Sequence, residues 1–212
     1  KDRPEVLYYR GNIDILNEHK SIAVVGSRKI SAVGAKLAYN AGSIIGKNGF
    51  NLVNGLALGC DAEALKGALA AGGKCAVVLP CGINEIYPKS NQWIAEEVLK
   101  QGGCLISEYP EGTRPEKYRF VQRDRLQSGM SQGVLVVEAM EKSGTMHTAE
   151  YAKKQNRRLA CYYHGLLKYS TGNNVLENLY QAAVIKTNED LENYLCEIAD
   201  IEEYTQLSFD FV

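Results

Sequence analysis

Short apolar runs alternate along the chain with longer stretches whose apolar residues recur at helical spacing. The runs show no polar alternation, so they predict strands that are buried on both faces, at residues 22–25, 51–53, 75–79, 104–107, 134–137, 159–162 and 183–185. Between them lie helical periods, as at Leu37, Ala41 and Ile45. This alternation predicts an α/β fold with a Rossmann-like, doubly wound, mainly parallel sheet flanked by helices. We expect one domain over residues 1–200 and a short tail over 201–212.

Ligands of such folds bind beyond the carboxyl ends of the strands, where loops lead into helices. The turn after the first run contains Gly26, Ser27, Arg28 and Lys29, and Ser31 is placed to cap the next helix. Helix N–H groups, a hydroxyl and an Arg side chain at one point suit a phosphate group. A purely structural turn explains the same residues about as well.

Two further turns have a similar composition. Gly55 follows the second run, and Asp61 is expected to cap a helix over residues 62–71 rather than to act as a catalyst. After the fifth run, Lys142 precedes a second helix start suited to anions, formed by Ser143, Gly144 and Thr145.

The segment 109–131 is the most cationic part of the chain. Its basic residues are interleaved with aromatic ones, namely Arg114, Lys117, Arg119, Arg123 and Arg125 with Tyr109, Tyr118 and Phe120. Single-stranded nucleic acid is bound by this combination, because cations contact phosphates and rings stack on bases. The alternative is a solvated surface helix that packs Phe120 inward.

Charge and cysteine content narrow the class of protein. The 212 residues carry a net charge of −1, but removing the eight acids of residues 187–212 leaves residues 1–186 at +7, which is compatible with a polyanion ligand. The six cysteines form no C-x-x-C pair, so we expect reduced, apolar cysteines and no metal or cofactor. No apolar run is long enough to cross a membrane. We therefore expect a cytoplasmic protein, and the start at Lys1 suggests a piece of a longer chain.

Several motifs in order make the chain resemble the DNA-processing protein family called DprA or Smf. The resemblance covers about residues 7–195 and rests on short segments at matching spacings, namely Leu7–Asn12, Val25–Arg28, Gly55–Gly59 with Asp61, Tyr87–Pro88, Ser107–Pro110, Phe120–Ser131, Glu138–Ala139 and Lys142–Thr145.

This resemblance implies a single-stranded DNA-binding protein without catalytic residues, which works as a homodimer and assists a RecA-type recombinase in recombination and natural transformation. The implied DNA-binding residues are Gly26, Ser27, Arg28, Gly55, Arg123, Arg125, Lys142, Ser143, Gly144 and Thr145. We expect Arg123 and Arg125 to be exposed, so that replacing either would hardly change the melting temperature.

The chain departs from the family pattern at several positions, among them Asp124 in place of Asn and Gln127 in place of Ile. A carboxylate between two phosphate-binding arginines would repel DNA or pair with one of them. Asp124 therefore favours an alternative, a nucleotide-binding or phosphoribohydrolase-like enzyme or sensor that uses the same pocket with Glu138 or Glu150.

The tail offers a second, independent hypothesis. The segment Gln206–Phe211 resembles the short peptides that dock into the bacterial sliding clamp, whereas a strap or a loose end is the simpler explanation.

Overall fold

A computed structural model describes residues 3–201 of the chain. Its strands, in chain order, are β1 (Tyr8–Gly11), β2 (Ser21–Val25), β3 (Asn51–Asn54), β4 (Cys75–Val78), β5 (Cys104–Ser107), β6 (Gly133–Val136), β7 (Arg158–Tyr162) and β8 (Ala183–Ile185). The α-helices are α1 (Ile15–Glu18), α2 (Ala32–Lys47), α3 (Cys60–Ala70), α4 (Gln92–Lys100), α5 (Lys117–Gly129), α6 (Gly144–Lys154), α7 (Thr171–Tyr180) and α8 (Asn188–Ala199), with 3₁₀ turns η1 (Lys89–Asn91) and η2 (His164–Leu166).

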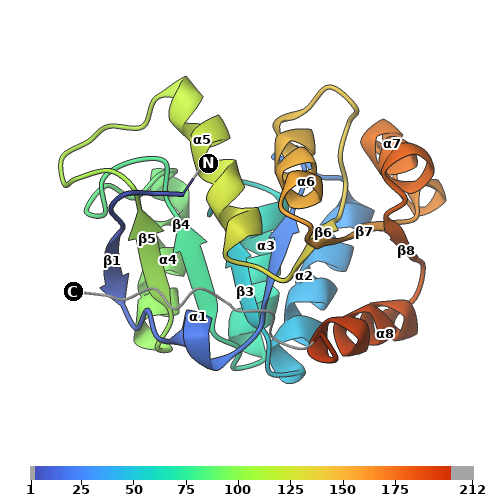
Figure 1. The fold of residues 1–212 in the computed structure, drawn as a ribbon, viewed down its shortest axis with the longest axis horizontal. Helices are drawn as coiled ribbons and strands as arrows, with labels where there is room; N and C mark the ends of the chain where they lie inside the picture. Colours follow the sequence, from blue (N-terminus) through green and yellow to red (C-terminus); the bar gives the residue numbers. More distant parts are fainter. Residues whose placement is uncertain (1–2, 202–212) are drawn as a thin grey trace.

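The strands form one eight-stranded sheet in the order β1-β5-β4-β3-β2-β6-β7-β8. Every neighbouring pair is parallel except β1 with β5, which is antiparallel. The chain winds from β2 towards β5 on one side and from β6 towards β8 on the other, so the predicted Rossmann-like, doubly wound sheet is confirmed (Figure 1). The order reverses between β2 and β6, and such a switch point is where these folds bind ligands.

The seven predicted strands all form, with ends that differ from the prediction by no more than one residue. Strand β1 was not predicted, and its residues Tyr8–Gly11 are all exposed. Without a buried face, this edge strand lacks the apolar pattern that identifies a strand in sequence. It forms because β5 offers a free edge, where Tyr9 pairs with Ile106.

Helices cover both faces of the sheet. Helices α2, α3, α4 and α8 share one buried cluster with alternate strand residues such as Ile22 and Leu52. The intervening strand residues, such as Ala23 and Val53, pack with α1, α5, α6 and α7 on the other face. This alternation explains the unbroken apolar runs, because both sides of each central strand are buried.

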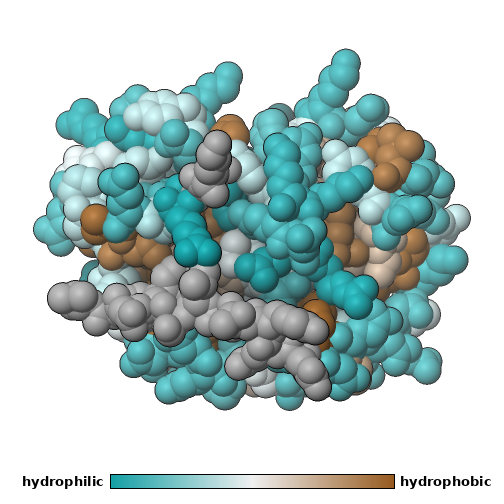
Figure 2. All heavy atoms as spheres, in the orientation of Figure 1, coloured by the Kyte–Doolittle hydropathy of each residue, from teal (hydrophilic) through white to brown (hydrophobic). Residues whose placement is uncertain are grey.

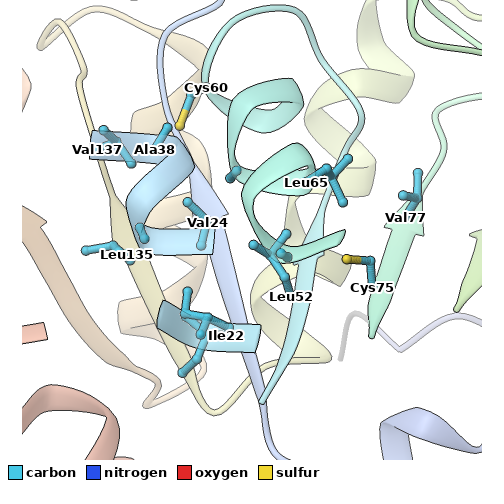
Figure 3. Close-up of a cluster of buried hydrophobic side chains, with 14 of the residues drawn as sticks. Ile22, Val24, Ala38, Leu52, Cys60, Leu65, Cys75, Val77, Leu135 and Val137 are labelled. Atoms are coloured by element: carbon cyan, nitrogen blue, oxygen red, sulfur yellow. The ribbon is translucent and has the colours of Figure 1, made fainter. Parts of the chain in front are cut away.

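Five of the six cysteines are buried and none is in a disulfide. Cys60 lies beside Val137 and Ala38, and Cys75 beside Leu52, as Figure 3 shows. Burial raises the pKa of Cys75 and of Cys104 to about 12. These thiols therefore serve as small apolar side chains, as predicted.

Helices α2 and α3 pack with their backbones in close contact. A Cβ added to Gly42 would lie 1.9 Å from the carbonyl oxygen of Ala64, and one added to Gly67 would lie 1.9 Å from that of Tyr39. Reciprocal glycines thus set the separation of the two helices. Because the loops after β2 and β3 lead into these helices, the same contact fixes those loops relative to each other.

No helix within residues 3–201 is long and apolar enough to span a membrane. The segment Gln206–Phe211 lies outside the described residues, so the sliding-clamp hypothesis stays a prediction.

Candidate nucleic-acid interface

The switch point joins the loop after β2 to the loop after β6. The Ser27 amide donates a hydrogen bond of 2.7 Å to the Glu138 carbonyl oxygen. The fully buried Glu138 side chain accepts from the Ser31 amide at 2.7 Å and from the Tyr169 amide at 3.1 Å. Glu138 therefore holds three loops together at the upper edge of the sheet in Figure 1. This use of both carboxylate oxygens gives Glu138 a structural role and does not support a catalytic one.

The loops after β2 and β3 touch through their backbones. Gly59 has a φ of 74°, and a Cβ there would lie 2.5 Å from the Ser27 carbonyl oxygen. The Cys60 amide donates to that same oxygen at 3.1 Å. Ser31 caps α2 by accepting from the Gly34 amide at 3.1 Å, as predicted.

The prediction that Asp61 caps a helix is wrong. Gly59 is the N-cap of α3, and Asp61 lies inside the first turn. Its carboxylate reaches back instead and accepts hydrogen bonds from the Gly55 amide at 3.0 Å and the Ala57 amide at 3.2 Å. Asp61 thus closes the loop after β3. Spacing alone does not distinguish this backward contact from an N-cap contact.

That loop holds a strained residue. Leu56 has a φ of 59°, a conformation that costs a non-glycine residue roughly 1–3 kcal/mol. The Leu56 amide donates to the Asn54 side chain at 3.1 Å, and its carbonyl accepts from the buried Asn91 side chain at 2.9 Å. Strain held by several buried polar contacts is typical of functional loops.

The Arg123 side chain packs on the loop after β3, at Gly55. Its guanidinium occupies the space where a Gly55 side chain would be, with Nη1 1.1 Å from the position of an added Cβ. Its side chain is 4% exposed, and neither Nε nor Nη1 has a hydrogen-bond partner. The expectation that Arg123 is an exposed cation is therefore wrong. Glycine at position 55 is required because it makes room for this guanidinium.

Two of the departures from the family pattern, Asp124 and Gln127, contact each other. The Gln127 side-chain amide donates to the Asp124 carboxylate at 2.9 Å, and the same carboxylate oxygen lies 3.5 Å from Arg123 Nε. Burial raises the pKa of Asp124 to about 6, against the opposing attraction of Arg123. Asp124 thus pairs with one arginine, as one of the sequence alternatives predicted.

Arg125 points to a different partner. Its guanidinium forms a two-pronged ion pair with Glu108, at 2.7 Å and 2.5 Å, and both side chains are 16% exposed. The expectation that it is exposed is wrong as well. The pair ties the middle of α5 to the residue that follows β5.

An aromatic platform lies beside these charges. The exposed Arg28 guanidinium lies 5.0 Å from the centre of the Phe120 ring, and the exposed Tyr87 ring contacts Phe120 edge-on at 5.4 Å. From the sequence Tyr87 is only a motif residue, because nothing local places it beside Phe120. Lys89 and Lys117, on η1 and α5, are exposed cations of the adjoining elements.

The start of α6 is more open. Ser143 is the N-cap, but its side chain makes no capping hydrogen bond and its buried hydroxyl has no partner. Gly144 is exposed, with open space where a side chain would be, and Lys142 is exposed. Helix α6 lies side by side with α5 at the front of Figure 1, and hydrophilic side chains cover it in Figure 2.

Within residues 3–201, no group of three or more His, Cys, Asp or Glu side chains is arranged to hold a metal ion. The fold and these loops define an α/β protein whose sheet switch point carries cations, aromatic rings and a helix start without a side-chain cap, as an anion-binding site does. The chain matches the family model described as DNA recombination-mediator protein A over residues 1–195. It belongs to that family.

Relatives within the family include Protein Smf of a Synechocystis species, 38% identical over 157 residues, which are 73% of this chain and 39% of the relative. DNA processing protein DprA of Bacillus subtilis is 35% identical over 158 residues, which are 74% of this chain and 53% of the relative. The aligned region thus spans about half or less of the length of these relatives.

Solved structures of DNA processing protein A have the same fold as this chain. DNA processing protein A from Helicobacter pylori, studied for its unique single-stranded DNA binding mode, superposes with a TM-score of 0.84 at 30% identity, over 93% of this chain and 89% of that one. DNA processing protein A (DprA) from Streptococcus pneumoniae superposes with a TM-score of 0.79 at 31% identity, over 91% of this chain and 67% of that one. A molybdenum cofactor carrier protein from Chlamydomonas reinhardtii shares the fold alone. Its TM-score is 0.60 at 19% identity, over 85% of this chain and 98% of that one.

Proposed function

We propose that this chain is a single-stranded DNA-binding protein that assists recombination. The exposed Arg28 guanidinium over the Phe120 ring, with Tyr87 at its edge, carries the proposal. A guanidinium binds phosphate while neighbouring rings stack on bases, and such stacking contributes about 1–3 kcal/mol per base. Family membership and the DNA-binding mode of the Helicobacter pylori relative support the same function.

In this proposal the candidate residues have different roles. Arg28 and Lys142 contact phosphates, and the amides of Gly26 and Gly144, with the hydroxyls of Ser27, Ser143 and Thr145, assist them. Arg123 packs on Gly55 and adds its charge and its unpartnered N–H groups to the site. Arg125 contributes mainly by orienting α5 through Glu108.

Fluorescence anisotropy with labelled oligo-dT over a salt series tests the proposal. Binding that neutralises several phosphates gives a log–log salt slope of roughly −0.7 for each phosphate. Arg28→Ala should weaken binding about tenfold or more and make the slope shallower. Arg158→Ala is the matched control, because Arg158 is also exposed but begins β7, at the amino ends of the parallel strands and away from the site. Equal binding by both variants would contradict the assignment.

We further propose that the chain works as a homodimer with a RecA-type recombinase as its partner. Support for self-association comes from the end of the sheet formed by edge strand β8, whose Ala183 is exposed, and from Leu179 of the preceding helix α7, which is 69% exposed. Hydrophobic residues are visible on the surface around α7 and β8 in Figure 2. Sedimentation should show a dimer that Leu179→Asp dissociates and Leu166→Asp does not. If this chain stimulates the loading of a RecA-type recombinase onto oligo-dT, the result would support the recombinase as its partner.

A nucleotide-binding or phosphoribohydrolase-like function is the second candidate, and Asp124 is the observation that favours it. A carboxylate beside Arg123 suits a ligand with sugar hydroxyls better than a phosphate chain alone. Thermal stabilisation by a mononucleotide together with salt-insensitive binding of oligo-dT would favour this function. Stabilisation by oligo-dT alone would count against it.

A further inference from the structure

Four charged side chains meet where the loops after β2 and β3 approach α5. Two are cations, Arg28 and Arg123, and two are carboxylates, Asp61 and Asp124. Asp61 and Arg123 are each 4% exposed, and the Asp124 side chain is 13% exposed. The exposed His147 of α6 also faces Asp124. With His147 neutral, the four charges sum to zero.

A phosphate group that enters this cluster adds a negative charge to a site with little water. Arg123 can donate hydrogen bonds to this phosphate, since its Nε and Nη1 are buried without a hydrogen-bond partner. The Asp124 carboxylate, 3.5 Å from Arg123 Nε, opposes phosphate binding there because it carries the same sign of charge. In a poorly solvated site a second anion beside that carboxylate is strongly disfavoured, and uptake of a proton removes the conflict.

The hydrogen bonds of the two carboxylates decide which one takes the proton. Asp61 accepts from the Gly55 and Ala57 amides, which favour its ionised form. Asp124 accepts from the Gln127 amide, and Gln127 Oε1 is buried without a partner. When its amide rotates, Gln127 can accept a hydrogen bond from the O–H of a protonated Asp124. The Gln127 side chain therefore accommodates both states of Asp124.

We propose that Asp124 couples phosphate binding to protonation, so that this chain takes up one proton from solvent when it binds single-stranded DNA. The inference rests on the proposed function and adds a pH dependence set by this residue. The pKa of Asp124 is raised to about 6 in the free protein, and a bound phosphate raises it further. Between those two pKa values, affinity falls as pH rises, by up to about tenfold per pH unit. Below the lower value, the contribution of Asp124 is constant.

Oligo-dT anisotropy at pH 5.5–8 and constant ionic strength tests the coupling, since neither thymine nor a phosphodiester titrates in this range. The wild-type protein should lose affinity as pH rises above about 6. Asp124→Asn should bind more tightly at pH 7.5 and show a smaller slope. Calorimetry in two buffers of different ionisation enthalpy should show proton uptake by the wild-type protein that Asp124→Asn reduces.

Two further variants separate Asp124 from its surroundings. His147→Gln removes the neighbouring imidazole that acts on Asp124, and the Asp124 slope should persist in it. Glu150→Gln is the matched control, because it removes an exposed carboxylate from α6 without touching the cluster and should keep the wild-type slope. A slope that is undiminished in Asp124→Asn, or that disappears in His147→Gln, overturns the inference. Binding by every variant without pH dependence also overturns it but leaves the proposed function standing, whereas no binding at any pH overturns both.

Discussion

At the scale of single residues, the buried Arg123 links stability to the site. Its guanidinium fills the space above Gly55 and balances two carboxylates, Asp61 and Asp124. Arg123→Ala should therefore lower the free energy of unfolding by about 3–5 kcal/mol, because it leaves buried charge uncompensated. Urea denaturation of this variant against Arg28→Ala, whose exposed side chain should contribute about 1 kcal/mol or less, measures the difference.

A double variant separates charge from packing. Adding Asp124→Asn to Arg123→Ala removes one of the stranded carboxylates and should recover part of the lost stability. If the double variant is no more stable than Arg123→Ala, the loss arises from the empty space above Gly55 rather than from charge.

The ion pair between Arg125 and Glu108 has a similar consequence. Two short contacts with both side chains 16% exposed predict a coupling free energy of about 1–3 kcal/mol. A double-mutant cycle of Arg125→Met and Glu108→Gln, followed by thermal or urea denaturation, measures it. Additive effects of the two changes would show that the pair does not stabilise the fold.

At the scale of elements, the contact of α2 with α3 positions the loops of the site. Gly42→Ala would place a Cβ 1.9 Å from the Ala64 carbonyl oxygen, so the helices must move apart, at a cost of about 1–3 kcal/mol. Gly129→Ala, in the last turn of α5, meets nothing closer than 3.7 Å and should be neutral or slightly stabilising. Urea denaturation compares the two, and equal stabilities would refute the close-packing argument.

At the scale of the whole molecule, stability should depend on pH through Asp124. Its folded pKa of about 6 exceeds the ordinary value of 3.8, so the folded state binds more protons between those values. The resulting stabilisation is fully present below about pH 3.8 and is lost as pH rises through about 6. A shift of this size corresponds to about 3 kcal/mol.

Asp124→Asn removes this dependence. It should exceed the wild-type stability by about 2–3 kcal/mol at pH 7.5, with a difference that shrinks towards pH 4. Urea denaturation at several pH values measures both curves, and parallel curves would contradict the assignment. The pKa of Asp61 is also raised by burial, so the same sign applies to that residue.

The sequence by itself determined the architecture of the sheet and the position of its loops. A run such as 134–137 is apolar on both faces only when helices cover both sides, so the runs identify the buried strands and predict a mainly parallel sheet. Caps such as Ser31 are equally readable, because the capping contact reaches only three residues along the chain. The cationic and glycine-rich turns likewise indicated the edge of the sheet where the candidate site lies.

Only the tertiary structure decided what each charged side chain does there. Arg123 packs on Gly55, Arg125 pairs with Glu108 and Phe120 contacts Tyr87, all from other elements of the fold, and no local pattern encodes such contacts. Burial follows from these contacts, which is why arginines with nearly the same sequence environment have different roles. The exposed strand β1 escaped prediction for the same reason, since only pairing with β5 makes it a strand. Periodicity records which faces are buried, whereas the pairing of charges depends on which distant segments meet.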